Sequence, residues 1–185
     1  VLWHVDTIGW SIPTFDRIAA YFPTYRSQLI AIEKQSGRVL WLKDIPRLPG
    51  GPPANATGTA GFGSTIASGI VVAMDQALFG FNSRTGELAW TFKPPLAIQD
   101  IAVPGSDGAH VFTATAGGMI YCLEGSTGAV RWQTFVGDSA AVPYSPVPFG
   151  TALYASFTVR AEPLDSGGVI ALDAPELMGR EVWFD

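Results

Sequence analysis

The sequence lacks most of the features that mark the commoner functional classes. Its 185 residues contain one cysteine, Cys122, so no disulfide can form within the chain. Only 15% of the residues are charged, and the net charge of −5 is unsuited to following a phosphate backbone. No apolar run approaches the roughly 18 residues of a membrane-spanning helix, and the N-terminus shows no charged-then-apolar leader pattern. We therefore expect no nucleic-acid partner and no membrane span in this chain.

Motifs for catalysis and metal binding are missing as well. There is no HExxH, no G-x-S-x-G and no phosphate loop, and the two histidines, His4 and His110, are too isolated for a metal pair or a triad. The string GTAGFG, from Gly58 to Gly63, matches a dinucleotide fingerprint superficially, but no helical pattern follows it. Cys122 lies among apolar residues, which indicates a buried filler and not a nucleophile. The sequence predicts no catalytic residue and no metal ligand.

What the chain does contain is a hairpin unit that recurs four times. Each copy has a short alternating strand, a tight turn and a second short strand that ends on tryptophan. The copies run from Leu29 to Trp41, Leu78 to Trp90, Ile120 to Trp132 and, with two extra residues, Val169 to Trp183. The turn glycine stands four residues before the tryptophan in every copy, at Gly37, Gly86, Gly128 and Gly179. Such a loop needs one residue at positive φ, which glycine adopts without strain.

Residue size alternates along the first strand of each unit. Large apolar residues occupy one face: Ile30 and Ile32, Phe79 and Phe81, Tyr121 and Leu123, Ile170 and Leu172. One small residue occupies the other: Ala31, Gly80, Cys122 and Ala171. This alternation predicts sheets stacked face to face, with small residues making room for the large side chains of the neighbouring sheet. The recurring tryptophans are predicted to anchor that packing between sheets.

A polar column precedes each turn, at Glu33, Asn82, Glu124 and Asp173. These side chains could be ligands for a metal, but we favour a structural role in which they accept hydrogen bonds from turn backbone N–H groups. The hydroxyl residue before the turn glycine, at Ser36, Thr85 and Thr127, is predicted to bond to its own turn in the same way.

The tryptophan spacing predicts the architecture. Trp3, Trp41, Trp90, Trp132 and Trp183 are 38 to 51 residues apart, which accommodates four short strands per step. We predict an all-β fold, a β-propeller of four-stranded antiparallel blades, with about four blades in one region spanning 1–185. The blades cover approximately 4–41, 42–90, 91–132 and 133–183, and 1–3 closes a preceding blade.

The other strands are predicted more coarsely, near Trp10–Phe15, Arg17–Tyr25, Ile98–Val103, Tyr144–Pro148 and Leu153–Arg160. A polar detour is expected from Ala161 to Gly168 and one helical turn from Pro175 to Met178, while the Pro/Gly-rich stretch from Pro46 to Gly63 reads as a long loop.

The repeated string (apolar, apolar, Ala, apolar, acidic, two variable residues, Thr-Gly, three variable residues, Trp) resembles the repeat of the PQQ-like, or quinoprotein alcohol dehydrogenase-like, β-propellers. The resemblance implies a ring of seven or eight blades in which tryptophans dock neighbouring blades. Four blades would then be half of a ring: a fragment, one of two chains that complete a circle, or a shorter ring closed by Val1 to Thr7.

The resemblance leaves function open, because enzymes and binding modules share this repeat. Its enzymes carry PQQ and calcium, typically beside two adjacent cysteines, and this sequence has no such pair. We predict a non-catalytic scaffold, without a cofactor, that binds a protein or ligand in the periplasm, outside the cell or at its surface, with self-association or a second propeller half as a further possibility. The alternatives are part of a PQQ-dependent dehydrogenase, with PQQ and calcium, and the extracellular sensor domain of a membrane receptor.

Ligand contacts, if present, are expected at the channel mouth, where the chain enters each innermost strand. Aligning the repeats places these residues there: Trp10, Ser11, Ser64, Gln99, Asp100, Tyr144 and Ser145. The competing interpretation is that the serines and the aspartate only satisfy backbone groups at the strand starts.

Overall fold

The structure is a computed structural model that describes residues 2–6, 12–24, 26–49, 63–75, 77–95, 103–115, 117–136, 141–143, 145–159, 166–173 and 181–183. For 141–143, 159, 166 and 181–183 it describes the backbone alone. All regular structure in these ranges is β-strand, which confirms the all-β prediction. Within them, no helix is long and apolar enough to cross a membrane.

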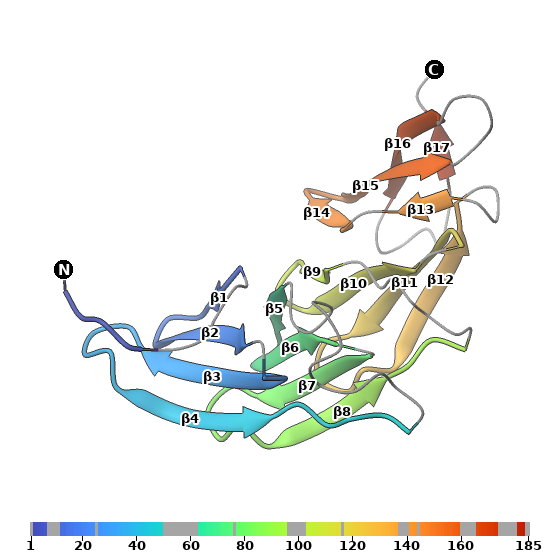
Figure 1. Cartoon of the computed structure of the whole chain (residues 1–185). Helices are drawn as coiled ribbons and strands as arrows, with labels where there is room; N and C mark the ends of the chain where they lie inside the picture. The colour runs from blue at the N-terminus through green and yellow to red at the C-terminus, as the bar shows by residue number, and fades with distance from the viewer. Residues whose placement is uncertain are drawn as a thin grey trace.

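The strands form four antiparallel sheets in chain order, called blades 1 to 4 below (Figure 1). Blade 1 contains β1 (Thr14–Phe15), β2 (Ala19–Thr24), β3 (Gln28–Glu33) and β4 (Val39–Asp44). Blade 2 contains β5 (Ser64–Ala67), β6 (Ile70–Met74), β7 (Leu78–Asn82) and β8 (Leu88–Phe92). Blade 3 contains β9 (Gly105–Ser106), β10 (His110–Thr115), β11 (Met119–Glu124) and β12 (Val130–Phe135). Blade 4 contains β13 (Ala141–Pro143), β14 (Val147–Phe149), β15 (Ala152–Val159), β16 (Ser166–Asp173) and β17 (Glu181–Trp183).

The short first strands of the blades lie side by side at the centre of the arc (Figure 1). β1 contacts β5, β5 contacts β9, and β9 contacts β14. Glycine allows this close approach: a Cβ on Gly63 would lie 2.2 Å from Cγ1 of Val103, and one on Gly105 would lie 2.2 Å from the carbonyl oxygen of Pro146. The blades therefore fan outward from a common axis, as in a propeller.

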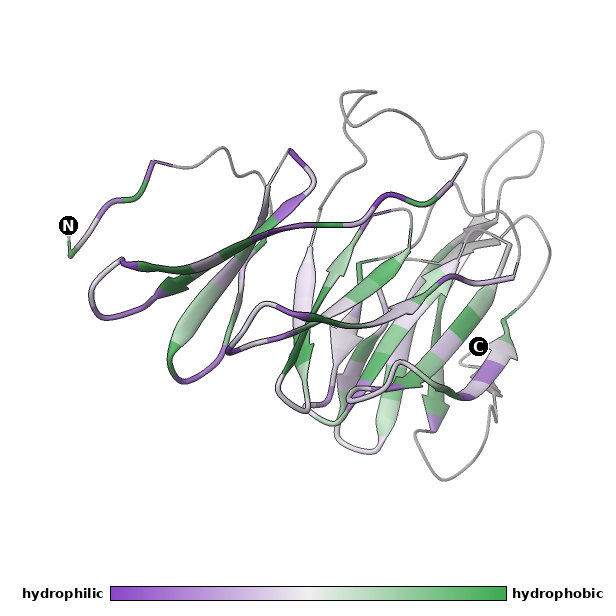
Figure 2. Cartoon of the chain, turned by 90° about the horizontal axis from the view of Figure 1, so that it is seen from below, coloured by the Kyte–Doolittle hydropathy of each residue, from purple (hydrophilic) through white to green (hydrophobic). Residues whose placement is uncertain are grey.

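Three hydrophobic clusters fill the spaces between consecutive blades. Between blades 1 and 2, for example, Tyr21, Ala31 and Trp41 pack with Phe79 and Phe81. Equivalent clusters join blade 2 to blade 3 and blade 3 to blade 4. Figure 2 shows the sheets stacked as slanted layers, with hydrophobic residues along the strands. The predicted face-to-face stacking is confirmed, and in blades 2 to 4 the large-residue face points to the preceding blade.

The small residues have a role that differs from the predicted one. They lie opposite the tryptophan of the adjacent strand in the same sheet, in the pairs Ala31–Trp41, Gly80–Trp90 and Cys122–Trp132. A Cβ on Gly80 would approach the Trp90 ring to 2.3 Å. The small side chain therefore makes room for the indole of its own blade, and that indole then packs against the next blade.

Blade 4 departs from the other three. Its innermost strand, predicted as one segment at Tyr144–Pro148, consists of two strands, β13 and β14, that both pair with β15. Both contain a proline, which an edge strand tolerates because its outer N–H needs no partner. The predicted detour also ends early, since β16 begins at Ser166.

The hairpin of blade 4 has a shifted register. Blades 1 to 3 each show an irregularity directly after the small residue, and their tryptophan lies opposite that residue. In blade 4, Trp183 pairs with Ile170, and Ala171 pairs with Val182. This copy of the repeat also has two extra residues between its small residue and its tryptophan.

One other strand prediction needs correction, and some further predictions fall outside the described residues. The innermost strand of blade 3 is at Gly105–Ser106, so the predicted strand at Ile98–Val103 ends before it, and Val103, its last residue, lies outside any strand. Three further predictions lie outside the described residues: the turn glycine Gly179, the proposed helical turn and most of the Pro46–Gly63 loop.

Candidate functional site

The strongest recurring feature is a dock that joins Trp3, Trp41 and Trp90 each to the blade that follows it, while Nε1 of Trp132 is buried without a hydrogen-bond partner among the described residues. The indole Nε1 donates a hydrogen bond to a turn carbonyl oxygen: Trp41 to Ser83 at 2.9 Å and Trp90 to Gly125 at 3.1 Å. Trp3 makes the same bond to Lys34 of blade 1, at 2.8 Å. Trp3 thus occupies, on blade 1, the position that the tryptophan of a preceding blade occupies elsewhere.

The turn glycine of the receiving blade lies directly under each ring. A Cβ on Gly37 would lie 2.8 Å from Trp3, one on Gly86 2.8 Å from Trp41, and one on Gly128 2.6 Å from Trp90. All three glycines have positive φ, between 69° and 74°. Glycine is therefore required twice, for the turn and for the contact with the indole. The prediction of a tryptophan anchor and a left-handed glycine is confirmed in these three docks.

The hydrogen bonds of the turns confirm part of the predicted pattern. The hydroxyl of Ser36, Thr85 and Thr127 accepts a bond from the N–H two residues later, at 3.2, 3.2 and 3.3 Å. In the polar column, Asn82 accepts from the N–H groups of Arg84 and Thr85, at 3.0 and 3.1 Å.

The glutamates of the polar column behave differently from the prediction. Glu33 accepts from the Ser36 hydroxyl and pairs with Arg38, while Glu124 pairs with Arg131 at 2.9 Å. The extra methylene carries a glutamate carboxylate past its own turn N–H groups to a side chain of the turn or the outer strand. The hydrogen bond from Ser36 also lowers the pKa of Glu33, against a small opposing effect of burial.

Blades 1 and 2 share a second link beside the indole bond. The buried Tyr21 hydroxyl lies 2.7 Å from Oδ2 of Asp16 and 3.3 Å from the carbonyl oxygen of Ser83, the same oxygen that Trp41 bonds. Burial and the hydrogen bond to Asp16 raise the pKa of Tyr21. Partial burial tends to raise the pKa of Asp16, but hydrogen bonds from Ala19, Tyr21 and Ile18 outweigh it, so that pKa lies below its usual value. The group is a neutral tyrosine held by an aspartate carboxylate.

A related turn in blade 3 pairs Asp107 with His110, with 2.9 Å between Oδ2 and Nδ1. Desolvation there tends to raise the pKa of Asp107, and the bonds from His110 and Ala109 lower it overall. This pair has one carboxylate and one imidazole, too few groups for a metal site. In the part of the chain that the structure describes, no three His, Cys, Asp or Glu side chains come together to hold a metal ion.

Cys122 lies in the core between blades 3 and 4, as predicted. Burial raises the pKa of its thiol to about 12. A thiol in this state is a weak nucleophile. The chain has no second cysteine to form the vicinal pair of the quinoprotein dehydrogenases, so its residues do not fit that cofactor arrangement.

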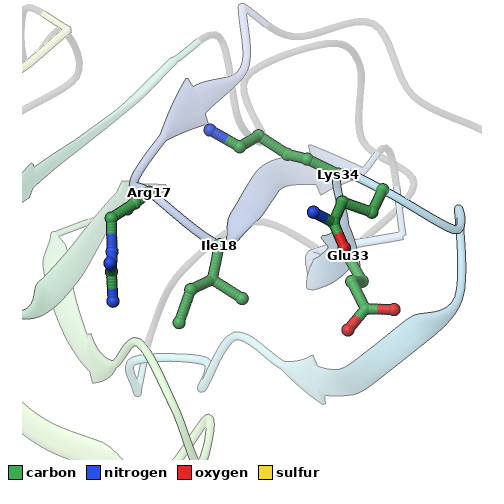
Figure 3. A pocket seen from close by; sticks show the side chains of 5 residues that line it. Arg17, Ile18, Glu33 and Lys34 are labelled. Carbon is green, nitrogen blue, oxygen red and sulfur yellow. The ribbon is translucent and has the colours of Figure 1, made fainter.

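One open pocket lies at the turn end of blade 1. Its volume is about 460 Å³, and it is lined by Arg17, Ile18, Glu33, Lys34 and Gln35. Figure 3 shows Ile18 between Arg17 on one side and Glu33 and Lys34 on the other. Nζ of Lys34 is held by the carbonyl oxygen of Asp16 at 2.6 Å. Arg17 has no ion-pair partner among the described residues.

Most of the predicted mouth residues lie outside the described ranges: Trp10, Ser11, Gln99, Asp100 and Tyr144. Ser64 begins β5, and its hydroxyl oxygen is buried without a hydrogen-bond partner among the described residues. Ser145 lies between β13 and β14 and is partly buried. The channel-mouth contact set therefore stays a prediction. Sequence reasoning missed the pocket on blade 1, because its lining comes from two turns that only the sheet brings together.

The repeated docks and the common axis define the class of protein, a β-propeller with tryptophan-docked blades. The family model described as outer membrane protein assembly factor BamB matches residues 1–142 and 98–183, and the chain belongs to this family. The predicted PQQ-like repeat is thereby confirmed.

A curated relative supports the assignment. The outer membrane protein assembly factor BamB of Nitrosomonas eutropha is 26% identical over 122 residues, which cover 64% of this chain and 27% of that protein. The chain thus matches about a quarter of the length of this relative.

Solved structures share the fold. BamB from Moraxella catarrhalis matches 92% of this chain and 59% of its own, at 18% identity and a TM-score of 0.59. The computationally designed Ika4 protein matches 87% of this chain and 88% of its own, at 12% identity and a TM-score of 0.64. Apo AztD from Citrobacter koseri matches 95% of this chain and 46% of its own, at 11% identity and a TM-score of 0.62.

Proposed function

We propose that this chain is a non-catalytic scaffold that binds protein partners during the assembly of outer membrane proteins, in the periplasm. The family match along almost the whole chain carries the proposal, since the model and the curated relative are both described as an outer membrane protein assembly factor.

The geometry supports a binding role. The Trp41 and Trp90 docks each fix the next blade through an indole bond, a covered glycine and a buried cluster, so the turns at these blade ends are held on a rigid frame. Binding residues on such loops keep their positions before a partner arrives, which lowers the entropic cost of association. The buried Cys122 and the polar side chains of the turns serve packing and turn formation.

The experiment is direct binding between the purified chain, immobilised by a terminal tag, and purified components of an outer membrane protein assembly machinery from a related bacterium. We expect saturable binding of one component. Absence of binding to every component by the folded chain would contradict the proposal.

The proposed contact surface is the channel mouth, and a matched pair of variants tests it. Ser145→Arg places a bulky charge at the mouth, and Leu88→Arg places the same charge on the outer strand of blade 2, where Leu88 is exposed. We expect at least tenfold weaker binding from the first variant and no change from the second. Equal effects would move the contact surface away from the mouth. Adding PQQ and Ca²⁺ is expected to leave the absorbance spectrum as the sum of the components.

A further inference from the structure

Three exposed cations lie where blade 1 meets blade 2, at the end of the blades that carries the β1–β2 and β3–β4 turns. They are Arg17 in the β1–β2 turn, Lys43 on β4 and Arg84 in the β7–β8 turn, and they are called the cationic junction below. Two of them belong to blade 1 and one to blade 2, so their grouping depends on how the two blades pack.

A buried hydroxyl brings the two arginines to the same place. The Tyr21 hydroxyl lies 2.7 Å from Oδ2 of Asp16 and 3.3 Å from the carbonyl oxygen of Ser83. Arg17 directly follows Asp16 in the chain, and Arg84 directly follows Ser83. The two turns that carry the arginines are therefore held against each other through one tyrosine.

The third cation covers the same turn of blade 2. A Cβ on Gly86 would lie 2.9 Å from Cγ of Lys43, beside the Trp41 ring. Gly86 is two residues after Arg84, so the Lys43 stem crosses from blade 1 to the turn that holds this arginine. Both blades of the junction are described, and its geometry does not depend on either end of the chain.

The three positive charges are not neutralised within the described part of the chain. None of them makes an ion pair there. Figure 3 shows the Arg17 side chain on the other side of Ile18 from Glu33. The carboxylates of the neighbouring turns already have contacts of their own: Asp16 with Tyr21, Glu33 with Arg38 and Glu87 with the Thr85 hydroxyl.

The repeat does not require these charges. The strand registers identify the equivalent positions at the junction of blades 2 and 3 as Ser68, Phe92 and Ser126, none of which is charged. That junction forms its indole dock and buried cluster in the same way. Since like charges repel, grouping three cations at one junction does not help the blades to pack.

We propose that the cationic junction binds an acidic segment of a protein partner. The guanidinium groups of Arg17 and Arg84 each match a carboxylate through two parallel hydrogen bonds, and Lys43 adds a third charge. The net charge of −5 on the whole chain repels an extended polyanion such as nucleic acid or an anionic membrane. A short acidic segment meets mainly the local charge, because salt screens exposed charges beyond about 8 Å at physiological ionic strength.

This surface is separate from the channel mouth. The chain enters each innermost strand at the mouth, and the β1–β2 turn lies at the other end of the same strand. The inference therefore does not rest on the proposed function, and Ser145→Arg at the mouth should leave binding at the cationic junction unchanged.

The test measures binding of the purified chain to a short peptide of alternating glutamate and glycine, with the glutamine version of the peptide as the control probe. We expect saturable binding of the glutamate peptide alone, weakened at least tenfold between about 50 and about 300 mM NaCl. The double variant Arg17→Gln, Arg84→Gln should bind at least about tenfold more weakly. Arg84→Lys keeps the charge but loses the planar fork, and should bind about threefold more weakly.

A matched double variant separates this site from the general charge of the chain. Arg26 and Arg47 are also exposed and make no ion pair among the described residues, but they lie at the β2–β3 turn and after β4. Arg26→Gln with Arg47→Gln changes the net charge equally and should leave peptide binding unchanged. Urea unfolding should give the parent midpoint for both double variants, because all four side chains are exposed.

Three outcomes would overturn the proposal. The glutamate peptide fails to bind the parent chain, or the two double variants weaken its binding equally. In the third outcome, phosphatidylglycerol vesicles bind the parent as tightly as the peptide does and are released by the Arg17→Gln, Arg84→Gln variant, which would assign the junction to an anionic membrane surface.

Discussion

Blades 1 and 4 are built from the same repeat, but equivalent faces of the two blades differ in whether another blade covers them. The face of blade 1 that meets blade 2 is covered, its tyrosine is bonded to two acceptors, and its tryptophan docks on Gly86. The matching face of blade 4 leaves Tyr154 and Val169 exposed. Similar residues at equivalent register positions thus have different energetic roles, because burial depends on the neighbour and not on the residue itself. The predictions below use one blade as the control for the other.

The largest difference is expected for the turn glycines. Gly86 and Gly150 both have positive φ, 69° and 61°, but an added Cβ meets the Trp41 ring at 2.8 Å only at Gly86, and meets nothing within 4 Å at Gly150. Gly150→Ala should cost about 1 kcal/mol from backbone strain alone. Gly86→Ala should cost about 3 kcal/mol, because the indole must also move. Urea unfolding of both variants measures the difference, and equal losses would show that the dock adds nothing to the turn.

The tyrosine hydroxyls come next. Tyr21→Phe removes a buried hydroxyl that bonds Asp16 and Ser83, and should lower the free energy of unfolding by about 1 to 2 kcal/mol. Tyr154→Phe, at a tyrosine that is exposed on blade 4, should change it by less than about 0.5 kcal/mol. A double-mutant cycle of Tyr21→Phe with Asp16→Asn would then measure the coupling free energy between these two side chains.

A pH profile tests the Asp16 turn. The pKa of Asp16 is lower in the folded chain, so the unfolded state binds the proton more readily. The stability it contributes is therefore present above the unfolded pKa of about 4 and is lost as the pH falls through the lower folded value. Asp16→Asn should show a shallower loss of stability between about pH 5 and pH 3 than the parent. Parallel profiles would mean that Asp16 contributes no pH dependence. Asp107→Asn gives the same measurement in blade 3, where the pKa shift has the same direction.

The smallest perturbation is chemical labelling of Cys122. Burial raises the pKa of this thiol to about 12, and the side chain is inaccessible. We expect no reaction with a thiol reagent near pH 8 in the folded chain and complete reaction in urea. Labelling of the folded chain would show that the interface between blades 3 and 4 opens to solvent.

Local patterns predicted the hairpins well, because their causes lie within a few residues. Positive φ at Gly37 and the hydroxyl bond of Thr85 are properties of a short turn, and sequence reasoning identified both. It assigned the glutamates Glu33 and Glu124 to the wrong hydrogen-bond donors, because Arg38 and Arg131 reach them from neighbouring turn and strand positions. The candidate site was predicted less well, since its residues come from loops whose positions depend on all the blades.

The period of tryptophan and glycine, with the repeated string around it, predicted the all-β class, the blade as the unit and the family. The packing of the blades decided the rest: that Gly80 makes room for the indole of its own sheet, that Ser83 accepts two donors from blade 1, and that Tyr154 is exposed while Tyr21 is buried. Turn and strand preferences act between residues close in the chain, so they can be predicted from the sequence. Contacts between sheets join residues about forty positions apart, and only the folded arrangement of the blades specifies them.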